Sequence, residues 1–288
     1  MVSKISDEIT TFPPIPQVVL KGIPMKFDET KIMGILNYTD DSFFEGSRHS
    51  SEKSILLKAE KMLQEGADIL DVGAYSSRPG AIEIPESVEI QKIESIIKSL
   101  RKEFPSAILS VDSFRSEVAN AGINEGADLI NDISGGDLDD KMFSVIAKHK
   151  VPYCIMHMRG TPQTMQNQTI YADIVSEIVR HFKVKIDRLN KLGIHDIILD
   201  PGIGFAKTVD QNFQLIKEIE TFQQLRLPLL YGISRKSFIQ KTLKIDSDQS
   251  LNGTSYLHNH LLEKNVSILR VHDVLELKQG IILQKQLR

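Results

Sequence analysis

The chain has 288 residues, of which 41% are hydrophobic and 6% aromatic, so it can bury a large core and is not disordered by composition. Its 35 basic and 38 acidic residues leave a net charge of −3, so no overall field attracts nucleic acid or an anionic membrane. The single cysteine, Cys154, excludes an intramolecular disulfide framework and lies in an apolar run typical of a buried core thiol. Since no apolar run approaches the length of a membrane span and the N-terminus has no signal-peptide pattern, we expect a cytoplasmic protein.

Residues 1–30, which include TFPPIPQ, lie outside the repeating pattern that fills the rest of the chain. We expect them to form an N-terminal extension before a single domain of residues 31–288. An arm, a short hairpin over the N-terminal end of that domain, and a disordered segment all fit this composition.

From residue 31 onward, apolar β-branched runs alternate with segments of helical spacing, which is typical of βαβ units and a parallel sheet. The predicted strands are 31–37, 68–73, 107–112, 128–134, 152–158, 196–202, 228–234 and 267–273. The predicted helical segments are 51–66, 86–104, 115–126, 140–150, 171–193, 211–222, 253–265 and 274–288. Several of these segments end in Gly, as expected of a helix C-terminal cap. Eight such units without a long interruption favour a closed (β/α)₈ TIM barrel over an open doubly wound sheet.

Polar residues stand at the C-terminal ends of nearly all these strands, where a barrel of this kind places its active site. They are Asn37, Asp71, Asp112, Asn131, Asp132, His157, Asp200, Ser234, Arg235, Lys236, Arg270, His272 and Asp273. The carboxylates and amide of Asp112, Asn131 and Asp200 suit the paired N–H groups of a planar heterocycle, whereas the donors Lys236, Arg270 and His272 suit a phosphate or diphosphate. The connections 38–51 and 74–87, each about fourteen residues long, are unusually long for such loops and suggest lids.

Seven motifs occur in register with these strands: ILNYTDDSF, GAYSSRPGA, SVDSFRSEVANAGINEGADLINDISGG, IMHMRGTPQTMQ, IILDPGIGFAKT, SRKSF and RVHD. In this order they closely resemble the dihydropteroate synthase family of folate biosynthesis, over roughly residues 31–280. The resemblance implies a (β/α)₈ transferase that condenses 6-hydroxymethyl-7,8-dihydropterin diphosphate with 4-aminobenzoate, giving 7,8-dihydropteroate and diphosphate. It also implies a Mg²⁺ cofactor, a homodimer and a target of sulfonamides, with small-molecule substrates and neither nucleic acid nor membrane as partner.

The resemblance assigns a role to each site residue. Asp112, Asn131, Met156, Asp200, Phe205, Gly232 and Lys236 would bind the pterin; Ser77, Arg78, Pro79 and Ser237 would border 4-aminobenzoate; Asn37, Arg270 and His272 would hold the diphosphate. Asn37 would also bind the metal, and Arg270, His272 and Lys236 would be the catalytic residues.

Other polar residues near these motifs favour structural interpretations. Asp132 and Asp273 alternate away from the ring, which favours a helix cap or a structural ion pair. Arg235 should point away from Lys236 and anchor a loop, while His157 suits an internal, a capping or a catalytic position. Three other functions stay open: a methyltetrahydrofolate-corrinoid methyltransferase, a non-catalytic pterin-binding protein, and an aldolase-type barrel with Lys236 as a Schiff-base nucleophile.

Overall fold

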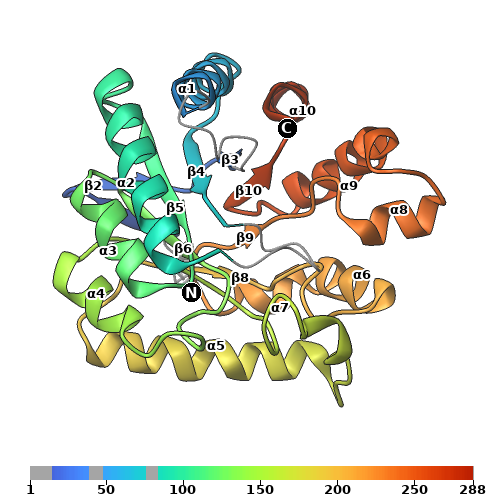
Figure 1. The fold of residues 1–288 in the computed structure, drawn as a ribbon. Helices are drawn as coiled ribbons and strands as arrows, with labels where there is room; N and C mark the ends of the chain where they lie inside the picture. The colour runs from blue at the N-terminus through green and yellow to red at the C-terminus, as the bar shows by residue number, and fades with distance from the viewer. Residues whose placement is uncertain (1–14, 39–47, 76–83, 288) are drawn as a thin grey trace, which may run out of the picture.

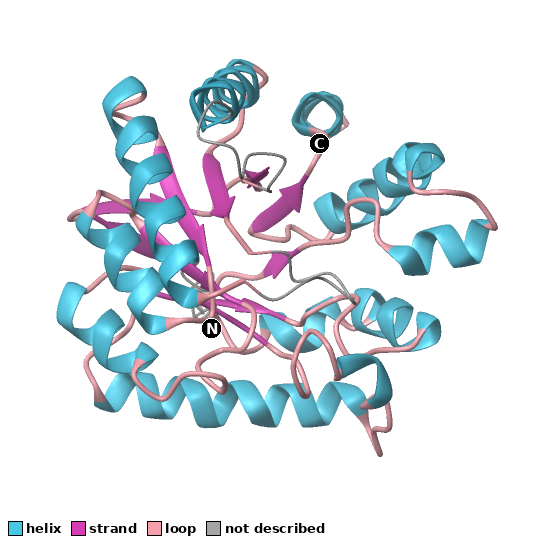
Figure 2. Cartoon of the chain, in the orientation of Figure 1, coloured by secondary structure: helices cyan, strands magenta, loops and turns pink. Residues whose placement is uncertain are grey.

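The computed structural model describes residues 15–38, 48–75 and 84–287. Helices surround a central ring of strands (Figures 1 and 2), as expected from the alternating sequence pattern. The strands of the ring are β3 (Lys31–Asn37), β4 (Ile69–Gly73), β5 (Ile108–Asp112), β6 (Leu129–Asp132), β7 (Tyr153–Met156), β8 (Ile197–Asp200), β9 (Leu230–Tyr231) and β10 (Ile268–Val271). Each of the eight predicted strands is therefore confirmed, although most are shorter than the apolar run that predicted them.

The ring is a parallel sheet that closes on itself. Its order is β8-β7-β6-β5-β4-β3-β10-β9, and a parallel bridge between Leu199 and Leu229 joins the two ends. The Leu199 N–H also donates to the Pro228 carbonyl at 2.9 Å, so the backbone hydrogen bonding continues across the join. The fold is a (β/α)₈ TIM barrel, as predicted, and the open doubly wound sheet is excluded.

The helices follow the predicted segments with two differences. They are α1 (Arg48–Gln64), α2 (Glu86–Glu103), α3 (Ser116–Asn124), α4 (Met142–His149), α5 (Ile174–Lys191), α6 (Val209–Lys217), α7 (Ile219–Gln223), α8 (Ser237–Leu243), α9 (Leu251–Glu263) and α10 (Val274–Gln286), with 3₁₀ turns at Met165–Asn167 and Asp248–Ser250. The predicted helix 211–222 is two helices, α6 and α7, and α8 is additional. The predicted glycine caps are confirmed at Gly66, Gly126 and Gly193, which have φ of +100°, +109° and +76°.

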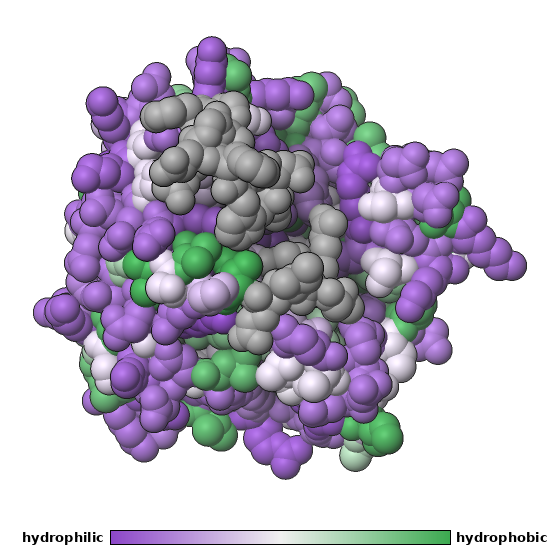
Figure 3. Space-filling view, viewed as in Figure 1, coloured by the Kyte–Doolittle hydropathy of each residue, from purple (hydrophilic) through white to green (hydrophobic). Residues whose placement is uncertain are grey.

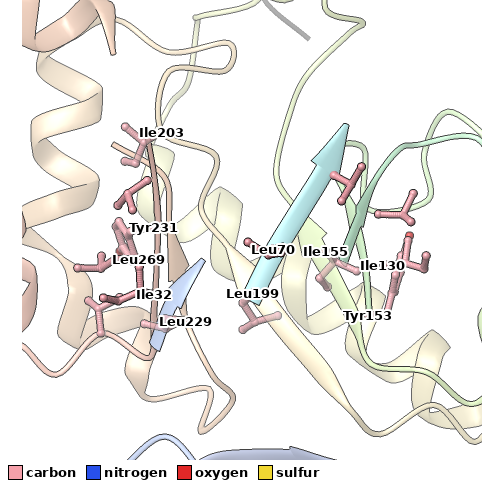
Figure 4. Close-up of a cluster of buried hydrophobic side chains, with 14 of the residues drawn as sticks. Ile32, Leu70, Ile130, Tyr153, Ile155, Leu199, Ile203, Leu229, Tyr231 and Leu269 are labelled. Carbon is pink, nitrogen blue, oxygen red and sulfur yellow. The ribbon is translucent and has the colours of Figure 1, made fainter. Parts of the chain in front are cut away.

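Alternate residues of each strand face opposite sides of the barrel wall. Outward-facing side chains such as Ile32, Leu70, Ile130 and Leu199 pack in the main core with residues of the surrounding helices (Figure 4). Inward-facing residues at the N-terminal end of the barrel form a second buried cluster: Met33, Ile69, Leu129, Cys154, Ile198, Leu230 and Ile268. Cys154 is thus a core thiol, as predicted, and burial raises its pKa well above the ordinary value.

A short antiparallel hairpin covers this N-terminal end. It consists of β1 (Gln17–Leu20) and β2 (Ile23–Lys26), and its Val18 and Leu20 join the second cluster together with Phe27. The Val19 N–H donates to Asp196 Oδ1 at 2.7 Å, and Lys21 Nζ lies 2.6 Å from Asp128 Oδ1. Of the arrangements considered for residues 1–30, the hairpin is confirmed for residues 17–26, and residues 1–14 lie outside the described part of the chain.

Candidate active site

The inward-facing strand residues change from apolar to polar toward the C-terminal end of the barrel. Two residues beyond the apolar inward layer, the inward positions carry Asp71, Ser110, Asn131, Met156, Asp200 and Arg270. Asp71, Ser110, Asn131 and Asp200 are all buried. Because burying a polar group is unfavourable without a partner, these side chains must bind one another or a ligand.

Arg270 connects one side of this layer to the other. Its Nε donates to Asp71 Oδ2 and its Nη2 to Asp112 Oδ2, both at 2.6 Å. Asp71 also accepts from Asn131 Nδ2 at 3.0 Å and from Ser110 Oγ at 2.5 Å. The Arg270 guanidinium therefore holds the carboxylates of Asp71 on β4 and Asp112 on β5 in place. Asp71 in turn positions the Asn131 amide of β6 through their hydrogen bond.

Asp71 is the main residue of this site whose role the sequence did not indicate. It is completely buried and contacts Ser110, Asn131 and Arg270. The signal that could have identified it is its position in the run DILDVG, where a charged residue stands at an inward position of an otherwise apolar strand.

Burial and charge act in opposite directions on Asp112. The pKa of this carboxyl is raised from 3.8 to about 7, because burial and the Asp71 carboxylate, which raise it, outweigh the Arg270 guanidinium, which lowers it. Asp71 and Asp112 thus share the Arg270 guanidinium, and the Asp112 carboxyl has a pKa near neutral pH.

Lys236 lies at the same end of the barrel, where the charges of Asp200, Arg270 and Asp112 act on it. Its Nζ donates to the Ile203 carbonyl and lies 4.8 Å from the centroid of the Phe205 ring. Burial lowers the pKa of Lys236 to about 8, and the charge of Asp200 counteracts this effect. Burial raises the pKa of Asp200, and Lys236 lowers it. A Cβ at Gly232 would lie 3.7 Å from both Lys236 Nζ and Arg270 Cβ, so this glycine lies close to both side chains.

Apolar side chains line the same end of the barrel. Met156 belongs to a small cluster with Ile133, Met158, Met165 and Ala206, against which Phe114 and Phe205 pack. Met156 is 2% exposed, whereas Phe205 is half-buried. The cluster gives the pocket apolar walls beside its polar floor, which suits a flat heterocycle.

Asn37 and His272 lie at the C-terminal ends of neighbouring strands. An ideal Cβ at Gly73 would be 3.6 Å from both Asn37 Oδ1 and Asp112 Oδ2, so these two side chains converge above Gly73. His272 Nδ1 lies 3.1 Å from Ser234 Oγ. Ser237 is exposed at the start of α8, and the predicted residues Ser77, Arg78 and Pro79 lie outside the described part of the chain.

The described residues include no group of three or more His, Cys, Asp or Glu side chains that could hold a metal ion. Mg²⁺, however, commonly binds through one or two protein oxygens, with substrate phosphates and water as its other ligands. Asn37 provides one such amide oxygen near the mouth of the barrel, and this donor set fits a metal carried in with a phosphorylated substrate.

Comparison with known proteins identifies the family. A family model described as "Pterin binding enzyme" matches residues 33–272. The chain is 40% identical over 271 residues to the dihydropteroate synthase of Synechocystis sp., covering 93% of each chain. It is 38% identical to that of Bacillus subtilis, covering 86% of this chain and 85% of that one. The chain belongs to the dihydropteroate synthase family.

Solved structures of family members share this fold over nearly the whole chain. The Yersinia pestis dihydropteroate synthase in complex with a sulfonamide drug has a TM-score of 0.88 at 34% identity, covering 94% of this chain and 99% of that one. The Xanthomonas albilineans dihydropteroate synthase with 4-aminobenzoic acid has a TM-score of 0.87 at 30% identity, covering 95% and 98%. The matched range 33–272 includes every described site residue that the sequence predicted.

The segment SRKSF, one of the family motifs, sends successive side chains to different partners. Arg235 forms a bidentate ion pair with Asp273, with both contacts at 2.8 Å, and also donates to the carbonyls of Ser247 and Asp248. This confirms a loop-anchoring Arg235 and a structural ion pair for Asp273. Lys236 alone of the two adjacent cations points into the pocket.

Two further polar residues near the motifs are structural. Asp132 does not cap a helix and forms no ion pair with a described residue: it accepts from Tyr153 Oη at 2.6 Å and from the N–H groups of Ser134 and Gly136 at 2.7 and 2.8 Å. It therefore holds the turn after β6, because an Asp side chain can bind backbone N–H groups two to four residues ahead. His157 is internal, 4% exposed, and has Lys207 as a neighbour.

Proposed function

We propose that this chain is a working dihydropteroate synthase, which joins 6-hydroxymethyl-7,8-dihydropterin diphosphate to 4-aminobenzoate and releases diphosphate. The observation that carries the proposal is the polar network at the C-terminal end of the barrel, where Arg270 binds Asp71 and Asp112, Asp71 binds Asn131, and the charges of Lys236 and Arg270 act on Asp200. The solved relative from Xanthomonas albilineans, which contains 4-aminobenzoic acid, supports the identity of the second substrate.

The pterin would bind with its N–H edge toward Asp112, Asn131 and Asp200, because a carboxylate accepts paired N–H donors in one plane. Met156 and Phe205 would pack on its two faces, and Lys236 would donate to an acceptor on the ring. Gly232 leaves space beside Lys236 for the heterocycle.

The diphosphate would lie toward Asn37, Arg270 and His272. A guanidinium has five N–H donors, and the contacts of Arg270 to Asp71 and Asp112 use two of them, so others can bind phosphate oxygens. A Mg²⁺ ion held by the Asn37 amide oxygen and the substrate would supply further positive charge to the leaving group.

The reaction forms a C–N bond and breaks a C–O bond at the pterin methylene carbon. The departing diphosphate takes the electron pair, and Arg270 and His272 stabilise the negative charge that develops on it. Asp112 and Asp200 are placed to stabilise positive charge spread into the ring. The amine of 4-aminobenzoate, held near Ser77, Arg78, Pro79 and Ser237, then attacks the methylene carbon and loses a proton.

The decisive test is a synthesis assay with both substrates and Mg²⁺. We expect one dihydropteroate and one diphosphate for each pterin diphosphate consumed. Pterin diphosphate that binds but yields no product would instead indicate a non-catalytic pterin-binding protein.

The oligomeric state and cellular location complete the proposal. No helix in the described ranges is long and apolar enough to cross a membrane. We place the enzyme in the cytoplasm as a homodimer, which sedimentation velocity and cell fractionation can test.

A further inference from the structure

Lys207 is a buried lysine behind the pterin pocket to which the proposed reaction gives no role. It is 5% exposed and lies in the loop between β8 and α6. None of the carboxylates among the described residues lies within ion-pair distance of its amine. Burying an ammonium group is unfavourable unless its donors are satisfied, so its partners indicate its function.

Three acceptors surround the Lys207 ammonium. Its Nζ lies 2.8 Å from the Phe205 carbonyl, 3.2 Å from the His157 carbonyl and 3.3 Å from His157 Nδ1. An ammonium has three N–H donors and no acceptor, so these contacts can satisfy it completely. His157 must then accept at Nδ1 and carry its ring proton on Nε2. Burial, followed by the charge of Lys207, lowers the pKa of His157 to about 2, consistent with a neutral ring.

These contacts connect the backbone next to Met156 with that of Phe205, the two residues predicted to form walls of the pterin pocket. His157 directly follows Met156 at the end of β7, and Phe205 is itself the second wall. The two backbones already approach closely: a Cβ at Gly202, where φ is +74°, would lie 2.1 Å from the His157 carbonyl oxygen. The Lys207 ammonium thus connects the loop after β8 to the end of β7 by hydrogen bonds.

The neighbouring elements do not depend on this ammonium. Thr208 begins α6 with a capping box in which Thr208 and Gln211 exchange hydrogen bonds. Asn212 holds the same loop by accepting from the Gly204 N–H at 2.6 Å. Loss of the ammonium should therefore leave α6 in place and act on the spacing between β7 and Phe205.

We propose that Lys207 is a positioning residue for the pterin, whose ammonium fixes the distance between the Met156 and Phe205 walls. The proposal rests on the proposed function, because it assumes that these walls hold the heterocycle. The charge of Lys207 also acts on Asp200: burial raises the pKa of this carboxyl, and Lys236 and Lys207 are among the groups that lower it. Burial lowers the pKa of Lys207 itself well below its ordinary value, so Lys207 favours the ionised Asp200 only where Lys207 is protonated.

The test compares K207M and K207Q with wild type and with the matched control K185M. Lys185 is also a buried lysine, 7% exposed, but it pairs with Asp137 outside the pocket. Affinity for oxidised 6-hydroxymethylpterin is measured by calorimetry, and the KM for 4-aminobenzoate is measured at saturating pterin diphosphate. Thermal unfolding verifies that each variant is folded.

We expect K207M to weaken pterin binding about 10- to 100-fold, because removing a buried ammonium leaves its hydrogen-bond acceptors unpaired and changes an equilibrium by about that factor. K207Q, whose amide keeps two N–H donors, should lose less pterin affinity than K207M. The KM for 4-aminobenzoate should change less than about twofold in both Lys207 variants. K185M should match wild type in both measurements.

Pterin affinity within about twofold of wild type in K207M would overturn the proposal. An equal loss for both substrates, or the same pterin loss in K185M, would show a general structural effect and would overturn it too. If K207M does not fold, K207Q decides by the same criteria. A wild-type protein that fails to bind the pterin would contradict the proposed function itself, which separates that failure from a failure of the Lys207 inference.

Discussion

Asp112 combines two roles that depend on pH in opposite ways. Its pKa is raised from 3.8 to about 7, first by burial. For the free protein, a raised folded-state pKa means that the stabilising contribution of this group is full below pH 3.8 and is lost as pH rises through about 7. For the pterin, the ionised form is required, because only a carboxylate offers two acceptors to paired N–H donors.

We therefore predict that pterin affinity falls as pH drops below about 7, by up to about tenfold per pH unit. Above about pH 8, loss of the Lys236 proton should weaken binding again. Calorimetry with 6-hydroxymethylpterin between pH 5.5 and 9 would measure both limbs. The D112N variant should bind weakly and lack the limb near pH 7; a wild-type affinity independent of pH would contradict the assignment.

Arg270 supports the pocket even before substrate arrives. R270A leaves the Asp71 and Asp112 carboxylates without their shared partner, so we expect a loss of about 3 kcal/mol in the free energy of unfolding at pH 7. Changing Asp71 to Asn in the same chain removes one of the two unpaired charges. The double variant should recover at least about 1 kcal/mol in urea unfolding. If D71N instead lowers the free energy of unfolding of R270A further, Asp71 and Arg270 do not act as a pair.

Sequence patterns identified the inward residues but not their partners. The strand pattern placed Asp112, Asn131 and Asp200 at the C-terminal ends of three strands, and the structure has each of them at the end of its strand. The same pattern could not indicate that Arg270 of β10 reaches across to β4 and β5, because that contact joins residues 199 and 158 positions apart. Asp71 was left without a role for this reason.

At the scale of elements, the hairpin is the part least specified by local pattern. Its strands have four residues each, and their apolar residues gain a buried environment only against the barrel interior. The short helix α8, with seven residues, escaped prediction for the same reason, since isolated helices of that length are unstable. Longer elements with strong periodicity, such as α2 and α5, were predicted nearly to their ends.

The hairpin should stabilise the barrel without affecting the chemistry. Phe27 is 8% exposed and packs in the second cluster, so F27A should lower the free energy of unfolding by about 3 kcal/mol while leaving both KM values unchanged. Ile23 of the same hairpin is 72% exposed, and I23A, as the matched control, should change stability by less than about 0.5 kcal/mol. Equal effects of the two variants in urea unfolding would show that the hairpin does not cover the core.

At the scale of the whole molecule, the alternation of inward-facing and outward-facing strand residues produces both the stable core and the candidate active site. The inward positions are apolar at the end that the hairpin covers and polar at the other, so barrel closure gathers charges from strands distant in sequence. The face seen in Figure 3 is mostly hydrophilic outside the grey atoms, with apolar residues in a few small groups.

The most direct test of this account is a crystal structure with the pterin diphosphate bound. We predict that the N–H edge of the pterin lies within hydrogen-bond distance of Asp112, Asn131 and Asp200, with the ring between Met156 and Phe205 and the diphosphate toward Arg270. A pterin bound outside this layer, or oriented with its phosphates toward the carboxylates, would contradict it.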